Sequence, residues 1–169
     1  ELTPEMAAVV AAQACVLTLG RTVDAFDHVT SILVYPSAFR VPGVYEDEAG
    51  IVTEDEDTLE GEAWQWGTVI LSWQELLRDD RTLNGRNLVL HEMAHQIDFL
   101  DVVGEVGGAG GEGNRRQRWT EEFLDAFDAF AEQVDAGRRV KALDAYGAED
   151  EREFFAVATE SFFERGGYL

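Results

Sequence analysis

The sequence is poor in cysteine, and this shortage excludes a class of disulfide-stabilised proteins. Its 169 residues include one cysteine, Cys15, so no intramolecular disulfide can form. The chain therefore lacks the pattern of a small secreted domain held together by disulfides, and we expect a cytoplasmic protein. Cys15 lies in an apolar stretch, which predicts a buried structural thiol.

Positive charge is also scarce. Thirteen Lys and Arg stand against 34 Asp and Glu, and the formal net charge at pH 7 is −21. A surface of this sign repels phosphate backbones and anionic lipids, so we expect neither nucleic acid nor a membrane as partner. We interpret the acidic excess first as a means of solubility, with a preference for basic substrates or partners as the alternative.

Long hydrophobic runs are missing as well. The apolar residues 7–19 are too few to span a bilayer, are interrupted by Gln13, and follow no basic segment of the kind that opens a signal peptide. The length fits one domain over residues 1–169. A first residue of Glu1 in place of Met is compatible with a trimmed chain.

Helical patterns outnumber strand patterns along the chain. We expect helices at residues 4–19, 73–77, 88–100, 119–134 and 150–163, strands at 32–35 and 68–73, and a hairpin or loop at 45–62. Six glycines in the ten residues 104–113 predict a mobile loop. Since helices dominate and the strands lie in the N-terminal half, we expect an α+β fold with a small mixed sheet.

The chemistry is concentrated in one string, His91-Glu92-Met93-Ala94-His95. Four residues of a helix advance about 400°, so His91 and His95 lie one above the other and can bind one cation. Two imidazoles suit Zn²⁺, and a catalytic zinc keeps three protein ligands and an open position for water. Glu92 is then the candidate general base. Two of the chain's three histidines lie in this string, which favours a metal site over chance.

A third ligand cannot be chosen from spacing alone. His28 lies far upstream, and we expect it to be structural or exposed. The sixth residue after His95 is Asp101, so the histidine that would extend the motif is missing. We therefore expect a downstream carboxylate. Glu153 and Glu160 are seven residues apart and project from the same helix face, and both remain open.

Several nearby residues allow two interpretations each. Asp98 can accept the free N–H of a ligating imidazole, or it can be a solvated charge. Residues 69–72 can hold a substrate as an added strand at a sheet edge, or they can form an interior strand. Trp64 and Trp66 can line a cleft, although packing in the core is the simpler role for them.

Three strings resemble the Mlc titration factor A family of zinc peptidases. They are HEMAHQID at 91–98, GEAWQWGTVILSW at 61–73 and EFFAVATESFF at 153–163, so the similarity covers roughly the last two thirds of the chain. The segment from Tyr146-Gly147 to Glu153-Phe154-Phe155-Ala156 is also similar to the catalytic region of anthrax lethal factor, a related gluzincin.

The resemblance implies a zincin-like fold with one catalytic zinc. It selects Glu153 as the third ligand and leaves Glu160 either to support a ligand from behind or to be structural. It also implies that Tyr146 faces the zinc and stabilises the oxyanion. The activity implied is hydrolysis of peptides or proteins, aminopeptidase-like on short peptides. The other implication is a regulatory module that sequesters a transcriptional repressor, with weak residual hydrolysis. Glu92 and Tyr146 favour the peptidase, because binding alone needs neither a base nor an oxyanion donor.

Overall fold

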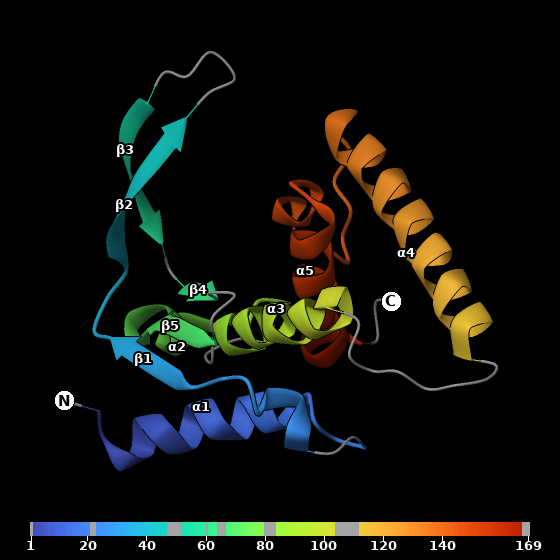
Figure 1. Cartoon of the computed structure of the whole chain (residues 1–169). Coiled ribbons are helices and arrows are strands. Elements are labelled where there is room, and N and C mark those ends of the chain that lie inside the picture. The colour runs from blue at the N-terminus through green and yellow to red at the C-terminus, as the bar shows by residue number, and fades with distance from the viewer. Residues whose placement is uncertain are drawn as a thin grey trace.

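The computed structural model shows an α+β fold in which helices predominate (Figure 1), as the sequence predicted. It describes residues 2–20, 23–46, 52–59, 61–63, 67–79, 84–103 and 112–166, and the side chains of these except at 23, 24, 39–46, 52–59, 61–63, 98–103 and 112–117. The helices are α1 (Pro4–Val16), α2 (Trp73–Asp79), α3 (Leu88–Val103), α4 (Glu112–Asp135) and α5 (Glu151–Arg165), with 3₁₀ turns η1 (Val23–Phe26) and η2 (Ala145–Ala148).

Three strands form the small mixed sheet that the sequence predicted. They are β1 (Ser31–Tyr35), β5 (Thr68–Ser72) and β4 (Gly61–Ala63), with β5 in the centre, parallel to β1 and antiparallel to β4. Val69 and Leu71 of β5 are fully buried. The alternative in which residues 69–72 form an edge strand is therefore wrong. Among the described strands, β4 is the edge that packs beside α3.

A separate hairpin corresponds to the acidic segment at 45–62. Strands β2 (Phe39–Glu46) and β3 (Val52–Leu59) pair antiparallel and extend away from the helices (Figure 1). The hairpin alternative is confirmed, but the hairpin begins earlier than predicted, at Phe39, and ends at Leu59. Trp64 and Trp66 lie outside the described residues.

The core lies where α1 and α3 pack on the sheet. Its fully buried side chains include Val69 and Leu71 of β5 and Val89 of α3. Leu90 and Ala94 of α3 are 3% and 0% exposed, so the side of the helix that carries them faces the core.

Two predictions about α1 are wrong. The helix ends at Val16 and not at residue 19, and Cys15 is exposed and not buried. Val10, Ala14 and Leu17 face the core, at the spacing of one helix face, and Cys15 lies about 100° away from Ala14 around the axis. Apart from Gln13, the residues around Cys15 are apolar, so the sequence does not indicate which face is buried.

Helix α4 begins earlier than predicted, at Glu112 instead of residue 119, so it includes the end of the glycine-rich segment. The rest of that segment lies outside the described residues. Phe154 of α5 packs on α4, with ring centroids 5.3, 5.7 and 5.5 Å from those of Phe123, Phe127 and Phe130. Aromatic contacts of this kind hold α4 on the face of α5 away from α3 (Figure 1). Within the described residues, no helix combines the length and apolar character that crossing a membrane requires.

Candidate metal centre

Helix α3 presents its histidines from a capped N-terminus. The side-chain oxygen of Asn87 accepts a hydrogen bond from the Leu90 N–H at 3.1 Å, and its backbone oxygen accepts one from the His91 N–H at 2.9 Å. Such a cap satisfies amide groups that the helix itself leaves without a partner. It fixes the start of the helix one turn before His91.

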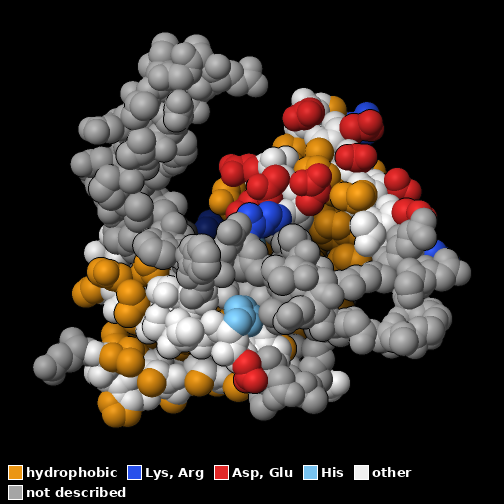
Figure 2. Space-filling view, in the orientation of Figure 1, with side chains coloured by type: hydrophobic (Ala, Val, Ile, Leu, Met, Phe, Trp, Pro, Cys, Tyr) orange, Lys and Arg blue, Asp and Glu red, His pale blue; other side chains and the backbone are white. Residues whose placement is uncertain are grey.

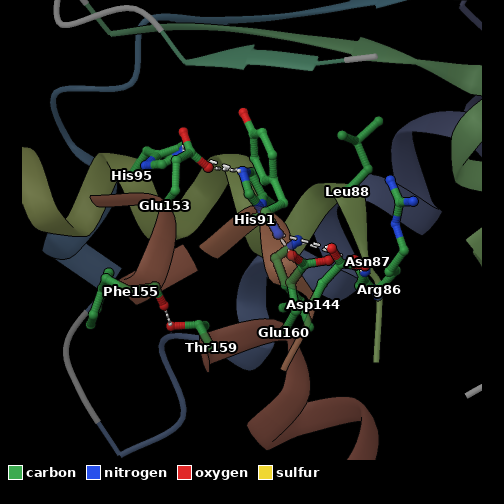
Figure 3. A network of polar contacts seen from close by, with 12 residues as sticks. Arg86, Asn87, Leu88, His91, His95, Asp144, Glu153, Phe155, Thr159 and Glu160 are labelled. Carbon is green, nitrogen blue, oxygen red and sulfur yellow. Dashed lines mark hydrogen bonds and ion pairs between the residues drawn. The ribbon is translucent and has the colours of Figure 1, made fainter. Parts of the chain in front are cut away.

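Helix α5 presents its glutamates in a similar way. The Asp150 carboxylate caps it by accepting hydrogen bonds from the N–H groups of Arg152 and Glu153, at 2.9 and 2.8 Å. Glu153 therefore lies in the first turn, and Glu160 follows two turns later on the same side. Since α5 packs against α3, both carboxylates face the histidines (Figure 3).

Three donor groups converge between these helices. Nε2 of His91 lies 3.0 Å from Oε2 of Glu153, and Nε2 of His95 lies 3.4 Å from Oε1 of Glu153. The two Nε2 atoms are 3.2 Å apart. One ligand atom from each residue falls within 4.8 Å of the others, and Figure 3 shows Glu153 directed at both rings.

The arrangement fits a divalent cation. Both Nε2 atoms and the Glu153 carboxylate crowd one space, and Oε2 of Glu153 is buried there without a well-aligned hydrogen bond. A cation held by both rings and the carboxylate would satisfy all three groups at once. Two imidazoles and one carboxylate are a donor set typical of zinc, and three protein ligands leave a position open.

Glu160 lies behind His91. Its Oε1 is 2.8 Å from Nδ1 of His91, on the side of the ring away from Glu153, and its Oε2 accepts the backbone N–H of Asn87. The carboxylate is 6% exposed. It orients the imidazole and leaves Nε2 as the nitrogen that faces Glu153.

The pKa values of His91 and Glu153 reflect these contacts. Burial alone would lower the pKa of His91, but hydrogen bonds with Glu153 and Glu160 outweigh it and raise that pKa from 6.5 to about 10. Burial alone would raise the pKa of Glu153, but hydrogen bonds with His91 and His95 lower it from 4.5 to about 2. Without a metal, His91 and Glu153 therefore form an ion pair near neutral pH.

Glu92 and Tyr146 border the same space. Glu92 is 5% exposed, and its negative charge contributes to the pKa shifts of both His91 and Tyr146. The Tyr146 ring lies on η2, with its centroid 6.0 Å from that of His91. Burial, and next the charge of Glu153, raise the pKa of Tyr146 above its ordinary value of 10, so the phenol keeps its proton at neutral pH.

Close packing sets the position of Tyr146. The Asp144 carboxylate caps η2 by accepting the Tyr146 N–H at 3.0 Å. A Cβ on Gly147 would lie 3.2 Å from Cβ of Val157, so the absence of a side chain lets η2 approach α5 closely. Sequence reasoning missed Asn87 and Asp144. Both are residues that typically cap a helix, which is the signal that could have found them.

Of the remaining candidates, only His28 has a described side chain, and its contact is with a residue outside the cluster. Nε2 of His28 is 3.1 Å from Oε1 of Gln96, a fully buried residue, so His28 is structural, as expected. The side chain of Asp98 lies outside the described residues, as does that of Asp101. Nδ1 of His95 is buried without a hydrogen-bond partner in the described part of the chain.

Comparison with known proteins gives a result consistent with a metal site. A family model described as glucose-regulated metallo-peptidase M90 matches residues 1–169, a longer stretch than the three similar strings indicated. An uncharacterized protein of Synechocystis sp. is 39% identical over 171 residues, which cover 99% of this chain and 62% of the relative. Mlc titration factor A of Pectobacterium atrosepticum is 35% identical over 149 residues, covering 88% of this chain and 55% of the relative. The same-named protein of Klebsiella pneumoniae is 32% identical over 164 residues, covering 96% and 62%. The chain thus spans 55–62% of the length of these curated relatives.

Proposed function

Because the chain belongs to the glucose-regulated metallo-peptidase M90 family, we propose that it hydrolyses peptide bonds at a zinc ion held by His91, His95 and Glu153. The resemblance to the Mlc titration factor A family is confirmed by the same match and by the relatives. The observation that carries the proposal is the convergence of the three donor groups within 4.8 Å, next to a buried Glu92. The fold is then zincin-like and of the gluzincin type, with residues 1–169 as one catalytic domain.

Each residue has one task in the proposed reaction. When bound, a zinc ion polarises the scissile carbonyl and lowers the pKa of water towards about 7. Glu92 follows His91 on α3 and accepts the proton of the attacking water. Glu160 holds His91 from behind and keeps Nε2 directed at the site.

The substrate backbone has an edge available to it. Strand β4 is an edge of the three-stranded sheet and packs beside α3, the helix that carries His91 and His95. We propose that a peptide binds as an added strand along β4, because backbone hydrogen bonds there accept many sequences. Residues 61–63, and not residues 69–72, are then the sheet edge that holds the substrate.

Tyr146→Phe should lower kcat by about 100-fold or more and change KM little, because a donor to the oxyanion acts mainly in the transition state. The phenol keeps its proton at neutral pH and can donate this hydrogen bond. Steady-state kinetics on one peptide substrate measure both constants. Tyr35→Phe, also an exposed tyrosine, is the control and should retain wild-type kinetics. An unchanged kcat in Tyr146→Phe would remove the tyrosine from the mechanism.

Metal affinity should fall as the pH falls, because the metal must displace a proton from His91. Below its raised pKa of about 10, His91 is protonated in the metal-free chain, and apparent affinity should drop about tenfold per pH unit for each proton displaced. Glu153, with a pKa of about 2, adds no proton between about pH 5 and pH 8. Calorimetry of zinc binding in buffers of different ionisation enthalpy measures the proton released. Affinity independent of pH would contradict this coupling.

A peptide-library cleavage assay with and without a chelator tests the proposal as a whole. We expect cleavage that stops with the chelator and returns with zinc, at about one ion per chain. The assay also reveals whether cleavage is aminopeptidase-like on short peptides. A chain that binds zinc stoichiometrically and cleaves no peptide would contradict the proposal.

The relatives' name favours a second candidate function. Mlc titration factor A is named for the titration of Mlc, so a module that sequesters a transcriptional repressor is the alternative for this chain. Such binding needs neither Glu92 nor Tyr146. Repressor capture that is equally strong in wild type and in Glu92→Gln, with no cleavage by either, would favour the binding module.

A further inference from the structure

A cavity of about 390 Å³ lies between the end of α4, the segment that leads to η2, and the turn before α3. Five of the chain's 13 cationic residues line it: Arg86, Arg138, Arg139, Lys141 and Arg165. The described lining includes one acidic residue, Asp144. In the whole chain acids outnumber cations by 34 to 13, and acidic side chains lie over α4 and the upper part of α5 (Figure 2). The cavity therefore has the opposite charge balance from the rest of the chain.

Helix ends account for only part of this set of cations. Arg138 and Arg139 follow the C-terminus of α4, where positive charge stabilises a helix. Arg165 has a comparable position in the last turn of α5, whereas Arg86 and Lys141 do not lie at the C-terminus of a helix. Arg139 and Lys141 are exposed and form no ion pair within the described part of the chain. Carboxylates are present on α4, since Arg118 pairs with Glu122 there.

The wall formed by α4 is fixed by its backbone. Gly137, two residues after the end of α4, has the left-handed conformation at φ 68°. The Gly137 N–H donates to the Val134 oxygen at 2.8 Å, and the Arg138 N–H donates to the Gln133 oxygen at 2.9 Å. This pair of bonds is the Schellman arrangement, so the backbone of Arg138 has a defined position at the cavity.

The opposite walls are attached to α5. Arg165 donates from Nη1 to the backbone oxygen of Asn84 at 3.1 Å, and its side chain lies so close over Gly85 that an added Cβ would come within 2.7 Å of Cδ. Ser161 donates to the backbone oxygen of Ala142 at 2.5 Å on the other side. Both loops are thus tied to one helix, which gives a preformed cavity.

The residues that line the cavity also indicate what kind of ligand it fits. Phe130, Val134 and Leu143 add an apolar side, and the volume is that of a small-molecule site. Guanidinium groups bind carboxylate and phosphate oxygens through paired hydrogen bonds. A net charge of −21 repels large polyanions at long range, whereas a small anion meets mainly the local charge of the cavity. We propose that this cavity binds a small organic anion with a phosphate or carboxylate group and a compact apolar body.

Calorimetric titration with phenyl phosphate, benzoate and neutral benzamide tests the proposal. We expect saturable binding, one molecule per chain, of phenyl phosphate or benzoate and none of benzamide. The stronger of the two anions then identifies phosphate or carboxylate as the preferred group. Equal binding of benzamide, or no saturable binding of either anion, would overturn the proposal.

Variants of the lining test whether the anion binds in this cavity or elsewhere on the chain, for example at a bound metal ion. The double variant Arg139→Gln, Lys141→Gln should bind the anion at least about tenfold more weakly, which is the loss of affinity typical of one charge-assisted hydrogen bond. Both side chains are exposed, so we expect only the small fall in thermal midpoint that losing one charge at the end of α4 brings. Arg118→Gln, which removes a cation outside the cavity, is the control and should bind as wild type does. Unchanged affinity in the double variant, or equal weakening in the control, would overturn the assignment.

Discussion

Replacing Glu92 with glutamine should lower kcat for peptide hydrolysis by about 100- to 10,000-fold and leave about one zinc per chain. Glutamine keeps the shape of the side chain but cannot accept a proton from water. Glu92 is not among the three residues whose donor atoms converge, so the metal should remain. Steady-state kinetics and metal analysis on the same preparation measure both quantities.

Glu75→Gln is the matched control for this variant. Glu75 is also a buried glutamate, 8% exposed against 5% for Glu92, and it pairs with Arg78 on α2. The same substitution there should leave kcat unchanged, although it removes an ion pair. Full activity in Glu92→Gln would eliminate the general-base role, and loss of zinc would place Glu92 among the groups that hold the metal.

The local parts of the candidate centre could be predicted from the sequence because they depend on helical periodicity. The four-residue spacing of His91 and His95 places both rings on one face wherever α3 lies in the fold. The same periodicity could not separate Glu153 from Glu160, because residues seven apart share a face of α5. The separation comes from the packing of α5 on α3, which brings Glu153 to both Nε2 atoms and Glu160 to Nδ1 of His91.

Features that depend on distant segments could not be predicted. The central place of β5 follows from its pairing with β1 and β4, and its own residues are compatible with an edge as well. The exposure of Cys15 depends on which side of an evenly apolar helix packs on the core. The basic cavity is assembled from cations at 86, 138, 139, 141 and 165, and no single one of them marks a site in the sequence.

Glu153→Ala should abolish stoichiometric zinc binding, whereas Glu160→Gln should weaken it by about 10- to 100-fold. The difference follows from geometry, since Glu153 shares its oxygens with both facing nitrogens, and Glu160 touches only the far side of one ring. Competition with a chromogenic chelator measures both affinities.

Glu151→Gln controls for the loss of one negative charge from α5, because Glu151 is exposed and lies in the same first turn as Glu153. It should bind zinc as the wild type does. Stoichiometric zinc in Glu153→Ala together with loss in Glu160→Gln would reverse the two roles. That reversal would require the His91 ring to use Nδ1 for the metal, and the Asn87 N–H that now holds Glu160 would then have to release the carboxylate.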